Sequence, residues 1–292
     1  MMKGKAKKTG GKTHREAPQK KKKSWWRIAL DIAALCAWIL VAVIAVQYVV
    51  GYLMLGILGA SEFGRPVWTA VYSAIVYVVA LTLVIFVPLG LRRRREEKGA
   101  EKATKEAARV KEKNSVKWKL EKAEMRMELG LSGLPTWTDV GLAPVGFIVS
   151  LIFAAGLVGL FSLFPWFNAE ETQNVGFSLY MSGGDRIIAF ITLVVMVPIA
   201  EEIIFRGWLY GKVRERLTGQ MPDAVGMVIS ILIVSVLFGL VHMQWNVGVN
   251  VFALSVVLCA LREITGTIYA GILTHMIKNG VAFFLLYVIG MG

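Results

Sequence analysis

Three groups of polar residues lie within long apolar segments in the second half of the chain. A charged side chain costs roughly 2.5–3.5 kcal/mol at the centre of a membrane helix, so ionisable residues there default to a functional hypothesis. A carboxylate can act as a general base, and imidazole or amide N–H groups can stabilise an oxyanion. The three groups are Glu201, Glu202 and Arg206; Phe238 and His242; and His275 and Asn279.

The first group combines two adjacent carboxylates with one cation. Glu202 and Arg206 are four residues apart, so they share a helix face and can form a structural ion pair. Glu201 lies about 100° around the helix from Glu202, which leaves it free to face a cavity. Because one Arg neutralises one carboxylate, the surplus glutamate is suited to act as a general base. Pro198 lacks a backbone N–H and predicts a kink just before the carboxylates.

The other two groups supply imidazole and amide side chains. Phe238 and His242 share one helix face, although a single His in an apolar helix is more often a packed residue than a catalytic one. His275 and Asn279 also share a face, where an amide can hold an imidazole or donate to an oxyanion. The occurrence of all three groups in one half of the chain predicts an active site.

The composition predicts a membrane protein that positions these groups on helices. Of the 292 residues, 56% are hydrophobic and 18% are charged, whereas soluble domains contain about 25% charged residues. Since a spanning helix needs about 20 mostly apolar residues, we expect an all-α integral membrane protein, a polytopic bundle of about seven transmembrane helices (six to eight). The expected spans are 27–58, 66–91, 142–166, 186–210, 224–244, 247–261 and 267–290.

The net charge of +13 is concentrated in two polar segments. Residues 1–27 hold 11 Lys or Arg and one Glu, and residues 92–128 hold 14 Lys or Arg and eight Glu. Basic residues beside apolar spans mark the cytoplasmic side, whereas a nucleic-acid-binding domain carries them on a folded face. We therefore expect a cytoplasmic N-terminus, membrane lipid as a partner and no nucleic acid. The short loops and the basic tail suit a bacterial plasma membrane.

The expected spans place two site residues at different depths. If the fourth span ends near 210 and the fifth begins near 224, Glu201 and His242 lie roughly 10–15 Å apart in depth. Because the two side chains must meet for catalysis, we expect that residues 211–226 fold into the membrane, or that one of the two spans is kinked or half-length.

The ordered motifs resemble those of a known protease family. Glu-Glu-x-x-x-Arg, then Phe-x-x-x-His, then His-x-x-x-Asn on successive helices is similar to the CPBP family (CAAX protease and bacteriocin-processing, or Abi), whose eukaryotic relatives include the CAAX prenyl endopeptidase. The resemblance covers about 129–290. It implies a glutamate-type intramembrane endopeptidase that hydrolyses a peptide bond of a membrane-associated protein or peptide.

The resemblance also implies a role for each site residue. Glu201 would activate the water with help from His242. The oxyanion would be stabilised by His275 and Asn279, and the Glu–Arg pair would orient the site. The implied catalytic residues are Glu201, Glu202, His242, His275 and Asn279, and the supporting residues are Arg206 and Phe238.

The family resemblance leaves the N-terminal part of the chain unexplained. The expected domains are a basic cytoplasmic tail (1–26), a two-span membrane anchor (27–91), a charged cytoplasmic linker helix (92–128) and a CPBP-like intramembrane protease domain (129–292).

Three alternatives stay open. Many family members are labelled metalloproteases, and Glu201, His242 and His275 could hold a zinc ion. A metal-free site with no cofactor is favoured, because Arg206 beside the carboxylates would compete with a cation. The other two alternatives are a non-catalytic immunity or scaffold protein of the same fold, and a proton-coupled transporter that uses the carboxylates as a relay.

Overall fold

The computed structural model describes residues 24–88, 125–171 and 181–290, together with the single residues 90, 94 and 177. Every regular element in this part of the chain is a helix. The predicted all-α polytopic fold and its seven spans are confirmed. The spans are Trp25–Phe63, Pro66–Phe86, Trp137–Phe161, Gly183–Leu217, Asp223–Leu240, Trp245–Thr265 and Tyr269–Ile289. The predicted tail and linker helix fall almost entirely outside the described residues.

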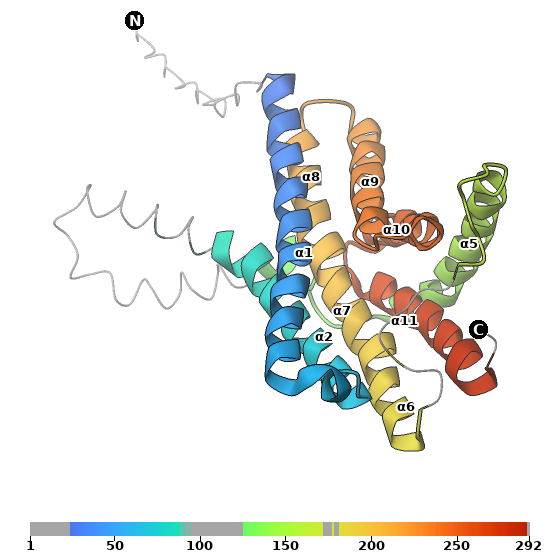
Figure 1. The fold of residues 1–292 in the computed structure, drawn as a ribbon. Helices are drawn as coiled ribbons and strands as arrows, with labels where there is room; N and C mark the ends of the chain where they lie inside the picture. Colours follow the sequence, from blue (N-terminus) through green and yellow to red (C-terminus); the bar gives the residue numbers. More distant parts are fainter. Residues whose placement is uncertain are drawn as a thin grey trace, which may run out of the picture.

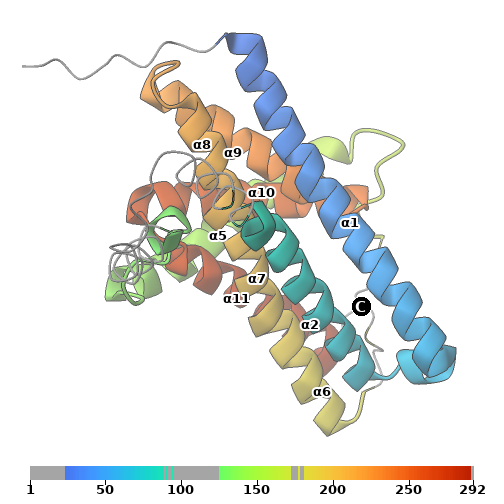
Figure 2. The same cartoon turned by 90° about the vertical axis from the view of Figure 1, so that its left-hand side faces the viewer.

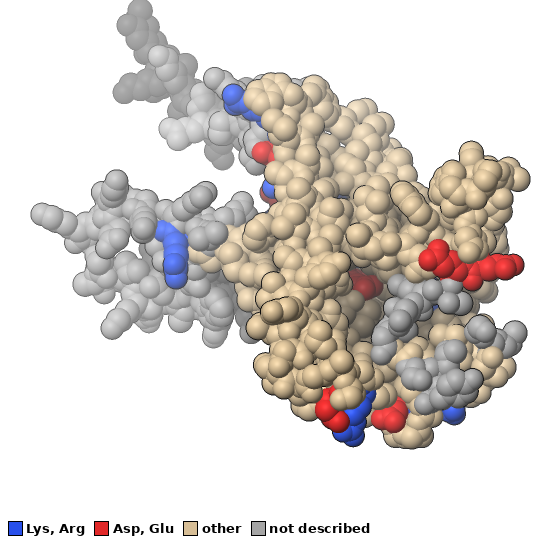
Figure 3. All heavy atoms as spheres, viewed as in Figure 1, with Lys and Arg blue, Asp and Glu red and all other residues tan. Residues whose placement is uncertain are grey.

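The surface of the described residues suits a lipid environment. In Figure 3, uncharged residues cover most of the visible face of the molecule. Large apolar side chains are exposed along the helices, among them Tyr52, Ile57 and Ile152. Such a surface is stable against hydrocarbon and costly in water. The protein is an integral membrane protein.

The first two helices form an antiparallel pair along one side of the molecule (Figure 1, Figure 2). α1 (Trp25–Phe63) has 39 residues, which at 1.5 Å per residue is about 58 Å and exceeds the apolar thickness of a bilayer. Its straight part ends at Gly59, where φ is +75°. α2 (Pro66–Leu81) begins with Pro66, because a first-turn residue has no helical N–H bond to lose. It continues as the π-helical η1 (Thr82–Phe86).

One continuous helix of 35 residues, Gly183–Leu217, carries the two adjacent glutamates. Ser182 caps its start by accepting the backbone N–H of Asp185. Two π-helical stretches interrupt it, and in the first of them the N–H of Val197 donates to the carbonyl of Thr192, five residues earlier. Its parts are α6 (Gly183–Phe190), η3 (Ile191–Met196), α7 (Val197–Glu202), η4 (Ile203–Leu209) and α8 (Tyr210–Leu217).

The hairpin between α8 and α9 (Asp223–Leu240) removes the expected difference in depth between Glu201 and His242. The fourth helix continues to Leu217 instead of ending near 210, and α9 packs against α8 in the opposite direction. Glu201 therefore lies about 24 Å before the end of α8, and His242 about 28 Å beyond the start of α9. The two residues reach similar depths. Within 211–226, residues 211–217 extend the fourth helix and residues 223–226 begin α9, so no separate re-entrant element forms in this segment.

α10 (Trp245–Thr265) runs across the other helices, since Figure 1 shows it nearly end-on and Figure 2 shows it lengthwise. It packs against α9, against α5 (Trp137–Phe161) and against α11 (Tyr269–Phe283), which continues as the π-helical η5 (Phe284–Ile289). A Cβ on Gly239 of α9 would lie 2.9 Å from the carbonyl oxygen of Gly248 of α10. The two backbones touch here, and this contact fixes the turn at 241–244.

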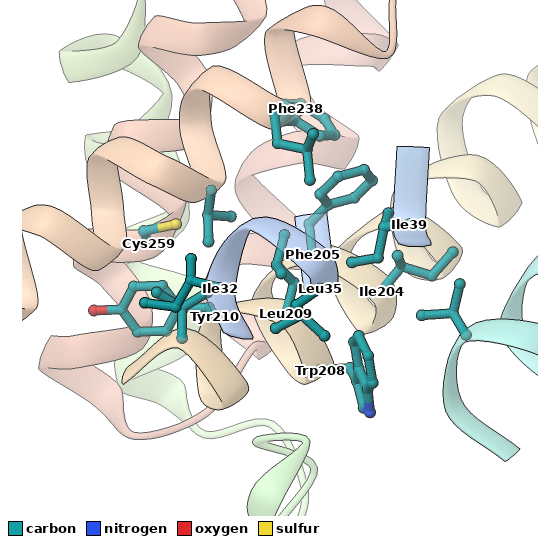
Figure 4. Packing of buried hydrophobic residues seen from close by; sticks show 14 of the residues in the cluster. Ile32, Leu35, Ile39, Ile204, Phe205, Trp208, Leu209, Tyr210, Phe238 and Cys259 are labelled. Atoms are coloured by element: carbon teal, nitrogen blue, oxygen red, sulfur yellow. The ribbon is translucent and has the colours of Figure 1, made fainter. Parts of the chain in front are cut away.

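The largest hydrophobic core joins the N-terminal helix pair to the helix that carries the glutamates. Ile32, Leu35 and Ile39 of α1 pack into one cluster with Ile204 and Leu209 of η4 (Figure 4). Buried residues of α2 and η1 belong to the same cluster. The two predicted anchor helices therefore share a core with the helices that carry the site.

Candidate active site

A buried ion pair lies at the centre of the site. The guanidinium Nη1 of Arg206 donates to Oε1 of Glu202 at 2.9 Å, and both side chains are completely buried. The imidazole Nδ1 of His275 lies 3.0 Å from the same oxygen. A carboxylate accepts hydrogen bonds, so Nδ1 carries the proton. The helical spacing predicted the Glu–Arg pair, and the structure adds His275 from α11 as a second partner.

Gly271 of α11 gives this ion pair the room that it needs. A Cβ at this position would lie 3.2 Å from Oε2 of Glu202, closer than most such contacts. Within the described residues, that oxygen has no hydrogen-bond partner. A glycine here lets the backbone of α11 approach the carboxylate, and this approach places His275 against Glu202.

Phe238 of α9 connects the ion pair with both histidines. The guanidinium carbon of Arg206 lies 4.2 Å from the centroid of the Phe238 ring, a cation–π contact. The same ring makes edge-to-face contacts with His242 at 5.0 Å and with His275 at 6.1 Å. Phe238 is fully buried, so it holds three polar side chains apart from one another in an apolar setting.

Glu201 has surroundings different from those of its neighbour Glu202. Its Oε1 accepts the hydroxyl of Tyr77 at 2.7 Å, and its Oε2 lies 3.8 Å from Nε2 of His275. Glu201 keeps 13% of its side chain exposed, whereas Glu202 is sealed. His275 stands between the two glutamates and presents one ring nitrogen to each. The carboxylate without an Arg partner is therefore the one that keeps an exposed fraction.

His242 follows α9 in the turn that leads to α10. Its Nδ1 lies 2.8 Å from the backbone carbonyl oxygen of Phe238, which can only accept, so Nδ1 is the donor. In a neutral ring, Nε2 then keeps its lone pair and is available to accept a proton. The next residue, Met243, has a φ of +55°, a left-handed conformation that is rare for a residue other than glycine.

Asn279 of α11 donates its amide to the backbone carbonyl of Leu193 at 2.9 Å. This carbonyl lies in η3, where hydrogen bonds reach five residues along the helix, and its partner in that register would be Pro198. Since Pro198 has no N–H, the carbonyl is left without a helical donor. The second amide hydrogen of Asn279 remains for another acceptor. Pro198 thus supports the site because it leaves the Leu193 carbonyl free to accept the amide N–H of Asn279.

Tyr77 is the residue of the site that the sequence analysis did not identify. It lies on α2, 124 residues before Glu201, in a segment expected to serve only as an anchor. Tyrosines in membrane helices are enriched at the interfaces. Tyr77 instead lies at the middle of its span, Pro66–Phe86. A tyrosine at the middle of an apolar span was the feature of the sequence that could have identified Tyr77 as a site residue.

The carboxylates and imidazoles are not arranged as a metal centre. No group of three or more His, Cys, Asp or Glu side chains is placed to hold a metal ion in the part of the chain that the structure describes. Of the alternative zinc ligands, His242 bonds through Nδ1 to a backbone carbonyl, His275 bonds through Nδ1 to Glu202, and Nε2 of His275 lies 3.8 Å from Oε2 of Glu201. A metal-free site stays a prediction.

Comparison with known proteins supports the predicted family. Residues 183–281 match the family model described as type II CAAX prenyl endopeptidase Rce1-like. The match begins at α6, ends in α11 and contains all seven predicted site residues, while Tyr77 lies outside it. Comparisons with curated proteins and with solved structures found no match. The helices that bring the two glutamates, the two histidines and Asn279 together are thus similar, over residues 183–281, to the Rce1-like CAAX prenyl endopeptidase domain.

Proposed function

We propose that the protein is an intramembrane endopeptidase in which Glu201 activates the attacking water. The observation that carries this proposal is the different setting of the two adjacent glutamates. Glu202 forms an ion pair with Arg206 and is completely buried, whereas the side chain of Glu201 keeps an exposed fraction and faces His275. A general base must reach the water that it deprotonates, and only Glu201 of the two can do so.

The proposed reaction is a single hydrolysis with no metal in any step. Oε2 of Glu201 removes a proton from water, and the oxygen of that water attacks the peptide carbonyl carbon. The carbonyl π electrons move to oxygen, and the second N–H of the Asn279 amide donates to the resulting oxyanion beside the ring of His275. The tetrahedral intermediate then collapses, the C–N bond breaks, and the proton held by Glu201 passes to the leaving amine. Nε2 of His242 accepts a hydrogen bond from the attacking water and orients it.

The family supports a substrate with a prenylated cysteine near its C-terminus. We propose that the protein releases the last three residues from such a peptide, which reaches the site from within the membrane. The N-terminus of α1 and the basic residues of α8 lie toward the same end of the molecule (Figure 1). By the positive-inside rule, we propose that this end is cytoplasmic.

The test uses the purified chain in phospholipid vesicles and a peptide that carries a farnesylated cysteine followed by three residues. Mass spectrometry should find the free tripeptide only when wild-type protein is present. A variant of an exposed loop glutamate, Glu170→Gln, should cleave as the wild type does. If the wild-type chain releases no tripeptide from the farnesylated peptide, the proposed substrate class is wrong.

A further inference from the structure

We infer that Tyr77 of α2 is a positioning residue for Glu201, so that the N-terminal helix pair completes the catalytic site of the matched domain. This inference rests on the proposed role of Glu201 as the base. It assigns a function to a part of the chain that lies outside residues 183–281, to which the family match is confined.

The contact itself is short and directional. The Tyr77 hydroxyl donates to Oε1 of Glu201 at 2.7 Å, the length of a strong O–H···O bond. Hydrogen bonds to an ionised carboxylate are about twice as strong as those between neutral groups. Because Oε1 is occupied by Tyr77, the carboxylate turns its other oxygen, Oε2, toward His275. The phenol thus selects which oxygen is available to a water molecule.

The remaining neighbours of Glu201 do not provide this constraint. His275 approaches Oε2 only to 3.8 Å, which is longer than a hydrogen bond. His242 and Lys278 act on Glu201 through electrostatic interactions, which set no direction for its carboxylate. Arg206 is bonded to Glu202 instead. The hydroxyl of Tyr77 is therefore the only hydrogen-bond donor to the Glu201 carboxylate within the described residues.

The helix that carries Tyr77 is held firmly against the domain. α2 packs on α6, η3 and α7, the helix segments that lead up to and include Glu201. Ala80, Val84 and Ile85, which follow Tyr77 on α2 and η1, are buried in the cluster that contains Ile204 of η4. Packing on both sides of the Tyr77–Glu201 bond fixes the distance between the two backbones. A rigid support of this kind is what a positioning residue needs.

The experiment replaces the Tyr77 hydroxyl and follows cleavage of the farnesylated peptide by the full chain in vesicles. Tyr77→Phe should lower kcat about tenfold, as expected for the loss of one hydrogen bond to a charged group, with KM unchanged. p-Aminophenylalanine at position 77 keeps a donor in the same place and should restore most of kcat. The matched control is Tyr72→Phe, because Tyr72 lies on the same helix and its hydroxyl donates to the backbone of Gln47, away from the site.

A double-mutant cycle separates positioning from a merely structural role. In the Glu201→Asp background the shortened carboxylate no longer reaches the phenol, so adding Tyr77→Phe should change the residual kcat less than about twofold. The inference is overturned if Tyr77→Phe cleaves like the wild type while Glu201→Gln is inactive. It is also overturned if Tyr77→Phe and Tyr72→Phe lose the same activity. Full activity of Glu201→Gln instead overturns the proposed function, on which the inference rests.

Discussion

Arg206 and Glu202 form an ion pair in which the guanidinium nitrogen and the carboxylate oxygen are 2.9 Å apart and neither side chain has any exposed surface. Two charges this deeply buried depend on each other, because removal of one leaves the other without compensation. The pair also determines which of the two adjacent glutamates is free for chemistry. Its loss should therefore affect both the stability and the activity of the protein.

Removal of Arg206 alone should destabilise the fold strongly. Arg206→Met leaves the buried Glu202 carboxylate without its cation and with only the His275 N–H as a partner, and breaking a buried pair costs roughly 3–5 kcal/mol. Denaturant unfolding in detergent micelles measures this loss. The double variant Glu202→Met with Arg206→Met should recover most of the stability and remain inactive. A single variant as stable as the wild type would show that the pair contributes nothing to the fold.

The space beside Glu202 is expected to tolerate only glycine. In Gly271→Ala the new Cβ would lie 3.2 Å from Oε2 of Glu202, so the carboxylate and His275 must shift. We expect a loss of kcat of about tenfold or more, since small misplacements of catalytic groups are costly. Gly280→Ala on the same helix is the control, because its Cβ would meet only Val194 at an ordinary 3.5 Å. Equal activities of the two variants in the peptide assay would contradict this assignment.

Two substitutions at Met243, the residue after His242, should have opposite effects on stability and different effects on activity. Met243 is exposed and has a φ of +55°, so Met243→Gly relieves a left-handed conformation that costs about 1–2 kcal/mol for other residues. We expect Met243→Gly to raise the thermal unfolding temperature and to retain activity. Met243→Val, with a branched Cβ, should lower both. If the valine variant matches the glycine variant in unfolding and in cleavage, the turn does not depend on this backbone conformation.

Cleavage should not require a metal ion. Arg206 donates to Glu202, and its positive charge beside the two carboxylates would compete with a cation. Dialysis against a strong chelator should leave kcat unchanged, and added zinc should give no increase. Loss of activity with the chelator, followed by recovery with zinc, would favour the zinc-dependent alternative.

Relationships within one helix were predictable from the sequence. The pairing of Glu202 with Arg206 follows from their spacing of four residues. The seven spans follow from apolar length. The end of the fourth helix could not be predicted from apolar length, because Lys212, Arg214 and Arg216 remain helical beyond the apolar stretch. That extension is what brings Glu201 and His242 to one depth.

Relationships between distant helices could not be predicted from spacing. Tyr77 and Glu201 are 124 residues apart, and their contact depends on how α2 packs against α7. The bond from Asn279 to Leu193 depends on a π-helical register that no periodicity reveals. Both contacts belong to the tertiary structure, which decides where a polar side chain finds its partner.

The central claim is that Glu201 is the base, and the most direct measurement is kcat for Glu201→Gln with the farnesylated peptide in vesicles. The amide keeps the size and shape of the side chain and can still meet Tyr77, but it cannot take a proton from water. The account predicts a fall in kcat of at least about a thousandfold with normal folding and peptide binding. Cleavage by Glu201→Gln at a rate close to that of the wild type would contradict it.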